Sequence, residues 1–397
     1  MENIKIKVVA ATTTNEEEIA KITKEQMELD GAHSANICYT KKTYDEILEE
    51  PIEKTKQRAE DNKVNLHHSV FGHDELSIYI EGIPKILAML LNNEHEYNTS
   101  EKSARYTIMQ PSETEQKLYD KWLEIITREI KRQYPNEPYL TDKLVHKKAM
   151  ENARYMISVF TRTKMRYTTS YRQFNYLYDF MKKMLAKETD NKLINEIKIY
   201  LPELIKAWES TGFTTGDIFD YSNREFSLIT DYNDYEEQYG RSYSMNYEAT
   251  FAAIAEEQRH RTIDLNISLK EEPQFYTPRI IEYDQGLIDA WQEDIHSVSS
   301  LYPQGLLLNV NETGKYENFI MKLYLRLCTA AQLEINNLNK IMLEKYIYEL
   351  KKANNPRDQK VLDALLEVSK GARCTFPGFT CPEQCHFKQG MTLKRKI

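Results

Sequence analysis

The stretch HHSVFGHDELSIYIEGIPKILAMLLNNEHEYNTSEKSARY, from His67 to Tyr106, contains the signals around which the rest of the chain can be interpreted. Residues 76–80 alternate between apolar and polar side chains, as a half-buried strand does, and residues 86–91 form an apolar run that favours a helix. The stretch ends in Ser103-Ala104-Arg105-Tyr106. A hydroxyl, backbone N–H groups and a guanidinium offered together suit a phosphate or a uracil edge. A solvated helix end is the alternative interpretation of the same residues.

The composition excludes several classes of function. With 397 residues and 41% apolar content, the chain can bury a substantial core and is expected to form two domains. The formal net charge of −8 argues against general binding to a nucleic-acid polymer. No apolar run reaches the length of a membrane span, and the amino terminus lacks the basic-then-apolar order of a signal peptide. Five cysteines in a chain of this length indicate a reducing compartment, so we expect a cytoplasmic protein.

The first half of the chain mixes strand and helix signals. Ser112 followed by Glu115 predicts a capped helix over 113–133, whose apolar side chains repeat with helical spacing. Pro202 is expected to interrupt a helix over 192–208. The other expected elements are strands over 4–12 and 163–169 and helices over 16–29, 146–156 and 171–185.

Residues 211–223 (TGFTTGDIFDYSN) are rich in glycine, threonine and aspartate, and we expect a linker there. After the linker the order of elements restarts, and this repetition suggests a tandem duplication. The expected elements of the second half are strands over 225–230 and 261–269, a helix over 247–258 and a long helical block over 316–353. We therefore expect a first domain over 1–210, a linker over 211–223, a second domain over 224–353 and a cysteine-containing tail over 354–397.

The pattern His67-x(3)-Phe71-x-His73, a strand, a helix and then Ser-x-Arg-Tyr resembles the first half of the flavin-dependent thymidylate synthase (ThyX) family. The resemblance implies an α+β fold with two tandem thymidylate-synthase-complementing-protein-like domains, each a mixed or antiparallel sheet with long packed helices. The family carries Arg-His-Arg at the end of that helix, where this chain has Asn92-Asn93-Glu94. The basic triplet that contacts flavin in the family is therefore missing from the first half.

The second half supplies such a triplet in Arg259, His260 and Arg261, which end a predicted helix. Three cationic or switchable groups in a row cannot all face a core, because burying unpaired charge is too unfavourable. They are expected to face solvent, acidic partners or an anionic ligand. A solvated basic helix end near Glu256 and Glu257 is the alternative.

Residues 302–335 match the closing segment of the family without a gap, and Arg326, Gln332 and Glu334 lie at the matching positions. Arg326 lies among leucines and a tyrosine, and an arginine in so apolar a setting needs an anionic or carbonyl partner. For Gln332 and Glu334 the alternative is that they are polar positions of a long amphipathic helix.

The losses in the two halves are complementary. The first half keeps Ser103, Arg105 and Arg154 but has Met181 where the family has a catalytic arginine, whereas the second half keeps the triplet and Arg326 but has no Ser-x-Arg-Tyr. Family enzymes are homotetramers whose active sites are shared between subunits. We therefore expect composite sites between the two halves, and a homodimer that imitates the tetramer of the family.

The resemblance also implies a chemistry. The family transfers a methylene group from methylenetetrahydrofolate to C5 of dUMP and reduces it with flavin hydride, which NADPH regenerates. Arg326 would stabilise negative charge on the uracil ring as a fixed cation in a desolvated pocket. The implied substrate-binding residues are Ser103, Ala104, Arg105, Arg154 and Arg259, and the implied residues on the FAD and folate side are His67, Ser69, Arg259, His260 and Arg261. For His73 a structural role is favoured.

Three classes of function stay open. The first is flavin-dependent C5 methylation of a uridine nucleotide, with dUMP as the default substrate and a nucleotide hydroxymethylase or UMP methylase as close variants. The second is a non-catalytic pseudoenzyme that binds nucleotide or a partner, which the lost flavin contacts at Asn92, Lys315 and Met321 favour. The third, a purely structural α+β assembly protein, leaves the surroundings of Arg326 unexplained.

The tail carries a separate signal in Cys374, Cys381 and Cys385, with His386 adjacent to the last. Three cysteines and a histidine within a short segment could hold a structural zinc ion. The spacing is not that of the usual zinc knuckles, and reduced structural thiols that close a loop are the alternative.

Overall fold

The computed structural model describes residues 3–12, 22–103, 110–230, 235–381 and 395–397. The described chain forms two compact units that are not continuous in sequence. Unit 1 contains residues 1–102 and 162–227, and unit 2 contains residues 103–161 and 228–397. Residues 103–161 therefore pack with the second half of the chain, although they lie within the predicted first domain. The predicted division into domains over 1–210 and 224–353, a linker over 211–223 and a tail over 354–397 remains a prediction.

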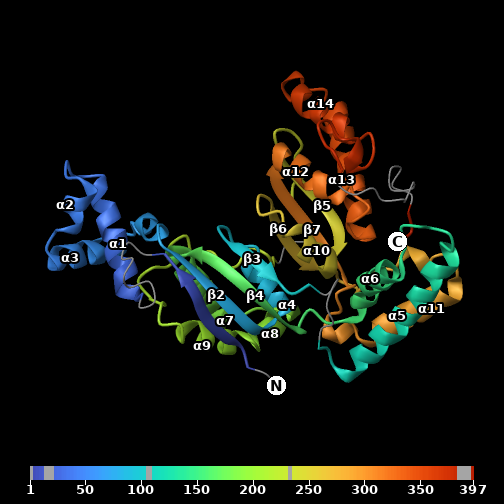
Figure 1. Cartoon of the computed structure of the whole chain (residues 1–397), viewed down its shortest axis with the longest axis horizontal. Coiled ribbons are helices and arrows are strands. Elements are labelled where there is room, and N and C mark those ends of the chain that lie inside the picture. The colour runs from blue at the N-terminus through green and yellow to red at the C-terminus, as the bar shows by residue number, and fades with distance from the viewer. Residues whose placement is uncertain (1–2, 13–21, 104–109, 231–234, 382–394) are drawn as a thin grey trace. The chain divides into compact units, whose positions relative to one another are not determined.

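Unit 1 is built on a four-stranded antiparallel sheet. Its order is β1 (Lys5–Ala11), β2 (Glu75–Pro84), β4 (Arg162–Ser170) and β3 (Asn98–Glu101), as Figure 1 shows. The expected strands over 4–12, 76–80 and 163–169 are confirmed. A register shift between Glu81 and Ile83 surrounds Gly82, whose φ of +75° is readily adopted only by glycine.

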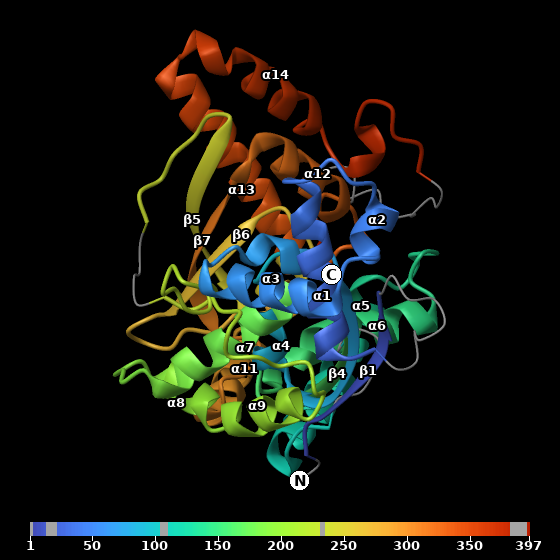
Figure 2. The ribbon, with the colours of Figure 1, turned by 90° about the vertical axis from the view of Figure 1, so that its left-hand side faces the viewer.

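Helices cover the sheet of unit 1 and form a lobe of their own at the amino-terminal end. The helix α4 (Lys85–Leu91) follows β2 directly and is buried from Ile86 to Leu91. The helix α7 (Tyr171–Ala186) packs on β2 and β4, and α9 (Leu201–Glu209) packs on β1 and α7. The remaining helices are α1 (Lys24–Ile37), α2 (Tyr44–Leu48), α3 (Ile52–Val64), the 3₁₀ turn η2 (His68–Gly72) and α8 (Lys192–Lys198). Figure 2 shows α1 and α3 side by side.

Two sequence expectations in unit 1 concern the ends of helices. The first helix starts at Lys24, where Thr23 and Gln26 form a capping box, and extends to Ile37 instead of ending near residue 29. Residues 16–21 of that expected helix lie outside the described residues. The interruption expected at Pro202 is confirmed, because α8 ends at Lys198 and Pro202 lies in the first turn of α9.

Unit 2 has a three-stranded antiparallel sheet in the order β5 (Ser242–Thr250), β7 (Leu307–Lys315) and β6 (Asp264–Leu269). The helices α5 (Glu113–Gln133), α6 (Asp142–Ala153) and α11 (Gln285–Ser297) lie together in Figure 1, and the Trp122 and Trp291 rings meet edge to face at 4.8 Å between α5 and α11. The other helices are α10 (Phe251–Glu257), α12 (Tyr316–Arg326), α13 (Leu333–Ala353), α14 (Gln359–Val368) and the short turns η3 (Arg154–Met156), η4 (Arg279–Ile281), η5 (Ser299–Leu301), η6 (Pro356–Asp358) and η7 (Arg373–Thr375).

The structure corrects three expectations in the second half. The helix expected over 247–258 begins only at Phe251, because the preceding residues pair with β7 and the Thr250 hydroxyl caps the helix at the Ala253 amide. The block 316–353 is two helices, and the break is stabilised by the Asn336 side chain, which donates to the Arg326 carbonyl at 2.7 Å. Residues 225–230 form no strand and contribute a single bridge, between Ile229 and Ile267.

The two sheets share one order of elements. In unit 1 the strand β2 leads directly into α4, and β4 leads directly into α7; in unit 2 the strand β5 leads into α10, and β7 leads into α12. The central strand is β4 in β2-β4-β3 and β7 in β5-β7-β6. This common order supports the tandem duplication, which remains a proposal.

The paired strands also supply a residue-by-residue correspondence between the halves. Ser170 and Lys315 each end the central strand, so Met181 and Arg326 correspond, since both lie eleven residues further on (170 + 11 and 315 + 11). Pro84 and Thr250 each end the strand before the short helix. Counting nine to eleven residues from these two makes Asn93-Glu94-His95 the counterpart of Arg259-His260-Arg261, one residue later than the Asn92-Asn93-Glu94 expected from the sequence.

No helix among the described residues is both long enough and apolar enough to span a membrane.

Candidate active site

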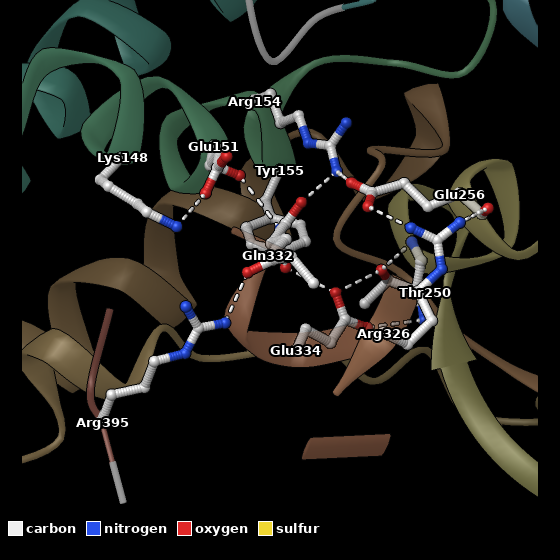
Figure 3. Close-up of polar contacts among 12 residues, drawn as sticks. Lys148, Glu151, Arg154, Tyr155, Thr250, Glu256, Arg326, Gln332, Glu334 and Arg395 are labelled. Atoms are coloured by element: carbon white, nitrogen blue, oxygen red, sulfur yellow. Dashed lines mark hydrogen bonds and ion pairs between the residues drawn. The ribbon is translucent and has the colours of Figure 1, made fainter. Parts of the chain in front are cut away.

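Arg154 and Arg326, one from each sequence half, bind the same carboxylate in unit 2. Arg154 begins the turn η3, Glu256 lies in α10, and Arg326 is the last residue of α12. Arg154 Nη2 lies 2.9 Å from Glu256 Oε1, and Arg326 Nη1 lies 3.8 Å from Glu256 Oε2. Figure 3 shows the two guanidinium groups on either side of the Glu256 side chain. The structure thus brings together two of the residues predicted for a composite site.

The apolar setting of Arg326 predicted an anionic or carbonyl partner, and the structure contains both kinds. Arg326 Nη2 donates to the backbone carbonyl of Glu256, and its Nε lies 4.0 Å from Glu257 Oε2. Arg326 is only 7% exposed, so these partners screen a charge that water does not reach. The acidic residues that the sequence suggested as neighbours of a solvated basic helix end are instead the buried partners of this arginine.

A second buried ion pair involves Lys322, one turn before Arg326 in α12. Lys322 Nζ donates to both carboxylate oxygens of Glu312 at 2.6 and 2.8 Å and lies 3.9 Å from Glu257. Glu312 also accepts hydrogen bonds from two tyrosine hydroxyls, and Glu257 accepts one from Asn339. Burial raises the pKa of Glu257, while the nearby Lys322 ammonium opposes that rise. The result is a continuous chain of alternating charges through the core of unit 2.

Gln332 and Glu334 belong to the same buried network. Arg154 Nη2 donates to the Gln332 side-chain oxygen, and Gln332 Nε2 donates to the Tyr155 hydroxyl at 2.5 Å. Glu334 accepts hydrogen bonds from the Tyr155 hydroxyl at 2.5 Å and from the Thr250 amide and hydroxyl at 3.1 and 2.9 Å. Burial raises the pKa of the Glu334 carboxyl. Both residues are under 10% exposed, so they are not solvated positions of an amphipathic helix.

The triplet Arg259-His260-Arg261 divides its side chains between two environments. Arg259 and Arg261 are exposed just beyond the end of α10, as expected for groups that face solvent or an anionic ligand. His260 is 5% exposed, and its Nε2 has no hydrogen-bond partner. Burial, together with the nearby Arg326 and Lys322 charges, lowers the pKa of His260 to about 2. His260 is therefore a neutral core residue in this structure.

A sequence comparison finds a family that part of the chain resembles. Residues 20–208 match the family model of thymidylate synthase complementing protein. The first half of the chain is ThyX-like. No match is found among curated proteins.

Solved structures of low similarity are found as well. The UMP/dUMP methylase PolB from Streptomyces cacaoi, bound with 5-Br dUMP, shares 14% identity at a TM-score of 0.31, over 53% of this chain and 92% of that chain. Thymidylate Synthase X from Helicobacter pylori, with FAD and dUMP, shares 14% identity at a TM-score of 0.29, over 53% of this chain and 99% of that chain. At such TM-scores these structures carry no argument about this chain, and the similarity to the family rests on the sequence match over residues 20–208.

In the ThyX-like first half, the counterpart of the basic triplet binds the chain itself. Glu94, 2% exposed, accepts hydrogen bonds from the Ser227 amide at 2.6 Å, the Ser227 hydroxyl at 2.9 Å and the Arg224 guanidinium at 2.8 Å. The Asn93 side chain donates to the same Ser227 hydroxyl at 2.9 Å. These contacts hold the segment 224–227 and explain why it does not pair as the expected strand.

The histidine of η2 that makes contacts is not the predicted one. His67 and Ser69 are exposed, whereas His68 between them is 2% exposed and lies near the Tyr176 hydroxyl and the Lys63 carbonyl, each at 3.3 Å. His73 is exposed, so the structural role favoured for it is not supported. The signal that could have identified His68 is its place before the apolar Val70 and Phe71, which are also buried.

Of the remaining predicted residues, Ser103 is half-buried, and Ala104 and Arg105 lie outside the described residues. In the tail, Cys374 is exposed and Cys381 is half-exposed, and Cys385 lies outside the described residues. Within the described part of the chain no group of His, Cys, Asp and Glu could hold a metal ion, so the zinc hypothesis gains no support there.

Sequence reasoning missed the buried glutamates as members of the site. Glu256 and Glu257 were weighed only as solvated neighbours of the basic triplet. The available signal was their place in an otherwise apolar short helix, FAAIAEE, because such a helix packs against a sheet and buries even its acidic residues.

Proposed function

We propose that this protein is a flavin-dependent enzyme that methylates C5 of a uridine nucleotide. dUMP is the default substrate, methylenetetrahydrofolate the one-carbon donor and NADPH the reductant. The main support is that Arg154 and Arg326 contact the same residue, Glu256. Arg154 belongs to the family-like residues kept in the first half of the sequence, and Arg326 to those kept in the second half. The match of the first half to the ThyX family model adds to this support. FAD, when bound, would supply the hydride that reduces the transferred methylene group.

The residues proposed for the substrate have distinct roles. Arg326 would stabilise negative charge on the uracil ring, and its buried position strengthens that electrostatic effect. Arg154 would orient the anionic nucleotide, together with Ser103, Ala104, Arg105 and the exposed Arg259. Because Arg154 and Arg326 lie in one unit of one chain, we propose that the composite site is completed within the chain. A homodimer would then carry two such sites.

The flavin side fits the predicted residues in part. Arg259 and Arg261 are exposed and can face the phosphate groups of an anionic cofactor. His260 is buried and neutral, so we withdraw it from the residues that would contact flavin. His67 and Ser69 are exposed in unit 1 and stay in the proposal as residues of the folate or flavin side.

One observation favours the second candidate, a non-catalytic nucleotide-binding protein. The charges of Arg154 and Arg326 are already compensated by Glu256. In the first half, Glu94 accepts a hydrogen bond from Ser227 within the segment 224–227. In that interpretation the arginines are structural and the exposed Arg259 and Arg261 alone would receive the phosphate.

The visible absorption spectrum of the purified protein, before and after addition of dUMP, separates the two candidates. A flavin band that changes on addition of dUMP, followed by 5-methylated product with NADPH and methylenetetrahydrofolate, is the expected result. Product analysis with dUMP and UMP then identifies the substrate and distinguishes a methyl from a hydroxymethyl product. A protein that takes up no FAD and yields no product with either nucleotide would overturn the proposed activity and leave the non-catalytic protein.

A further inference from the structure

The carboxylate of Glu256 lies where two buried guanidinium groups converge. Arg154 is 4% exposed, Arg326 is 7% exposed, and Glu256 is 4% exposed. The Nε atoms of both arginines are buried without a hydrogen-bond partner. Two buried cations therefore share the bridging Glu256 carboxylate and still have donor capacity to spare, which is what a site for a larger oxyanion requires.

The fold of the second half does not need these charges. In the first half Met181 stands at the position of Arg326, and Leu90 stands at the position of Glu256, since each of the latter lies six residues beyond its strand (84 + 6 and 250 + 6). Met181 is fully buried, and Leu90 is 1% exposed. The same order of strands and helices is thus built around an apolar pair in one half and a charged pair in the other.

A buried ion cluster that the fold does not require is unfavourable to keep unless it serves another purpose, because replacing it with apolar residues is often neutral or stabilising. Two arginines that bind an anionic ligand explain the cluster. Without any anion beside them, the two guanidinium groups would be left uncompensated in the core, and that state is strongly unfavourable. A carboxylate of the chain itself can fill the site until an oxyanion replaces it.

We propose that Arg154 and Arg326 form a binding site for a phosphate-sized oxyanion, and that Glu256 occupies this site in the absence of ligand and is displaced by it. The inference rests on the proposed function only for the natural ligand, which would be the anionic nucleotide. Glu256 thereby acts as an internal competitor that weakens the binding of every anion. Exposed Arg259 and Arg261, which follow Glu256 closely in sequence, would draw anions toward this end of α10.

The other two buried glutamates near the site, Glu257 and Glu312, have partners of their own, so Glu256 is the carboxylate that an anion would have to displace. Glu257 is held by Asn339 and lies near Lys322, and Glu312 is held by Lys322 and two tyrosines. Neither carboxylate lies between the two arginines. Removal of the Glu256 carboxylate should therefore leave Arg154 without its anion and Arg326 with only the more distant Glu257, at 4.0 Å. A small anion from solution should then take the place of Glu256.

Thermal unfolding of Glu256→Ala in sodium phosphate and in sodium chloride of equal ionic strength tests the site. In chloride the variant should unfold several degrees below the wild type. In phosphate it should recover several degrees more than the wild type gains, because phosphate compensates both arginines. Glu151→Ala is the matched control: Glu151 is a buried glutamate of the same unit whose carboxylate pairs with Lys148 at 3.1 Å, whereas Glu256 is the carboxylate that pairs with both arginines. It should lose stability without any specific gain from phosphate.

Two further variants settle the interpretation. Glu256→Gln keeps the shape of the side chain and should show the same preference for phosphate with a smaller initial loss. Adding Arg326→Met, which copies Met181, to Glu256→Ala should abolish the preference. If Glu256→Ala does not fold in chloride, the proposal requires that it fold in phosphate. Equal responses of wild type, Glu256→Ala, Glu256→Gln and Glu151→Ala to phosphate, or a variant unfolded in both salts, would overturn the site. Because inorganic phosphate is the probe, this result is independent of whether the protein proves to be an active methylating enzyme.

Discussion

Arg154 and Arg326 are joined through Glu256, although they lie in different halves of the sequence. The salt bridge from Arg154 measures 2.9 Å and the contact from Arg326 measures 3.8 Å, and all three side chains are buried in unit 2. Residues 103–161 are what makes this possible, because they carry Arg154 from the first half into the unit formed by the second half. Arg154, kept in the first half of the sequence, and Arg326, kept in the second half, thus lie close together in the structure.

Arg326→Met should lower turnover by roughly 100–1,000-fold, as the loss of one group that stabilises developing negative charge does. The free energy of unfolding should fall by only about 1–3 kcal/mol, because Glu256 keeps Arg154 and Glu257 keeps Asn339 as partners. Steady-state kinetics and urea denaturation measure the two quantities. Unchanged turnover in a folded variant would remove the assigned role of Arg326.

Lys322→Leu should destabilise the protein by about 3–5 kcal/mol, because it leaves the Glu312 carboxylate buried without its cation. The first half carries Leu177 and Tyr167 at the corresponding positions (322 − 145 and 312 − 145, the offset of 170 from 315). The double variant Lys322→Leu/Glu312→Tyr, which copies these uncharged residues, should therefore be much less destabilised than the sum of the single changes. Additive losses in urea denaturation would argue against the correspondence between the halves.

The strands and most helices could be predicted from the sequence because local patterns fix them. Ser112 with Glu115 forms the expected capping box, and the apolar run 86–91 is the buried helix α4. The positions of Arg326 and the triplet followed from the resemblance, and the need of Arg326 for a buried anionic partner followed from the desolvation of its charge.

Long-range relationships could not be predicted in the same way. The sequence of residues 103–161 does not show that this segment packs with the second half. The apolar faces of its helices indicate that they are buried, but not which unit buries them. The burial of Glu256 and His260 depends on how the short helix α10 packs on α13 and β5, and only that packing decides which of its charges face the core. Glu94 was seen as a lost basic residue, whereas its actual role depends on the distant Ser227.

Asp74 should make the stability of the protein depend on pH. Burial and the nearby Asp30 raise the pKa of Asp74 to about 7, well above its value in an unfolded chain. Below pH 4 the carboxyl is protonated in both states and carries no penalty. Between pH 4 and 7 the unfolded state ionises while the folded state keeps its proton, so the stability that protonation provides is lost as pH rises.

Asp74→Asn removes this ionisation and should therefore stabilise the protein at pH 8 by up to roughly 4 kcal/mol relative to the wild type, with little difference at pH 4. Urea denaturation of both proteins across this range measures the effect. A difference between the two proteins that stays constant with pH would mean that the Asp74 carboxyl titrates normally.

Glu94→Ala should release the segment 224–227, because it removes the acceptor for two hydrogen bonds of Ser227 and the partner of Arg224. Hydrogen exchange of the Ser227 amide should increase by at least roughly tenfold, in line with the loss of a charge-assisted hydrogen bond of more than about 1.4 kcal/mol. Glu225→Ala, which alters an ion pair of the same segment with Lys187 at 3.4 Å, is the control and should leave the Ser227 amide protected. Equal exchange in both variants would show that the segment is held by other contacts.

Mixing two inactive variants distinguishes a site completed within one chain from a site shared between chains. Arg154→Met and Arg326→Met should each be inactive alone, and a mixture unfolded and refolded together should stay inactive, because each chain lacks one of the two arginines that meet at its own Glu256. The double variant Arg154→Met/Arg326→Met mixed with wild type is the control, and it should retain activity in proportion to the wild-type chains. If the mixture of single variants recovers roughly a quarter of the wild-type activity, Arg154 of one chain acts with Arg326 of another. The proposal of a site within one chain would then be wrong, even if the protein methylates its nucleotide. Since the arginines lie in unit 2 and their shared carboxylate belongs to the same unit, the geometry favours the first outcome.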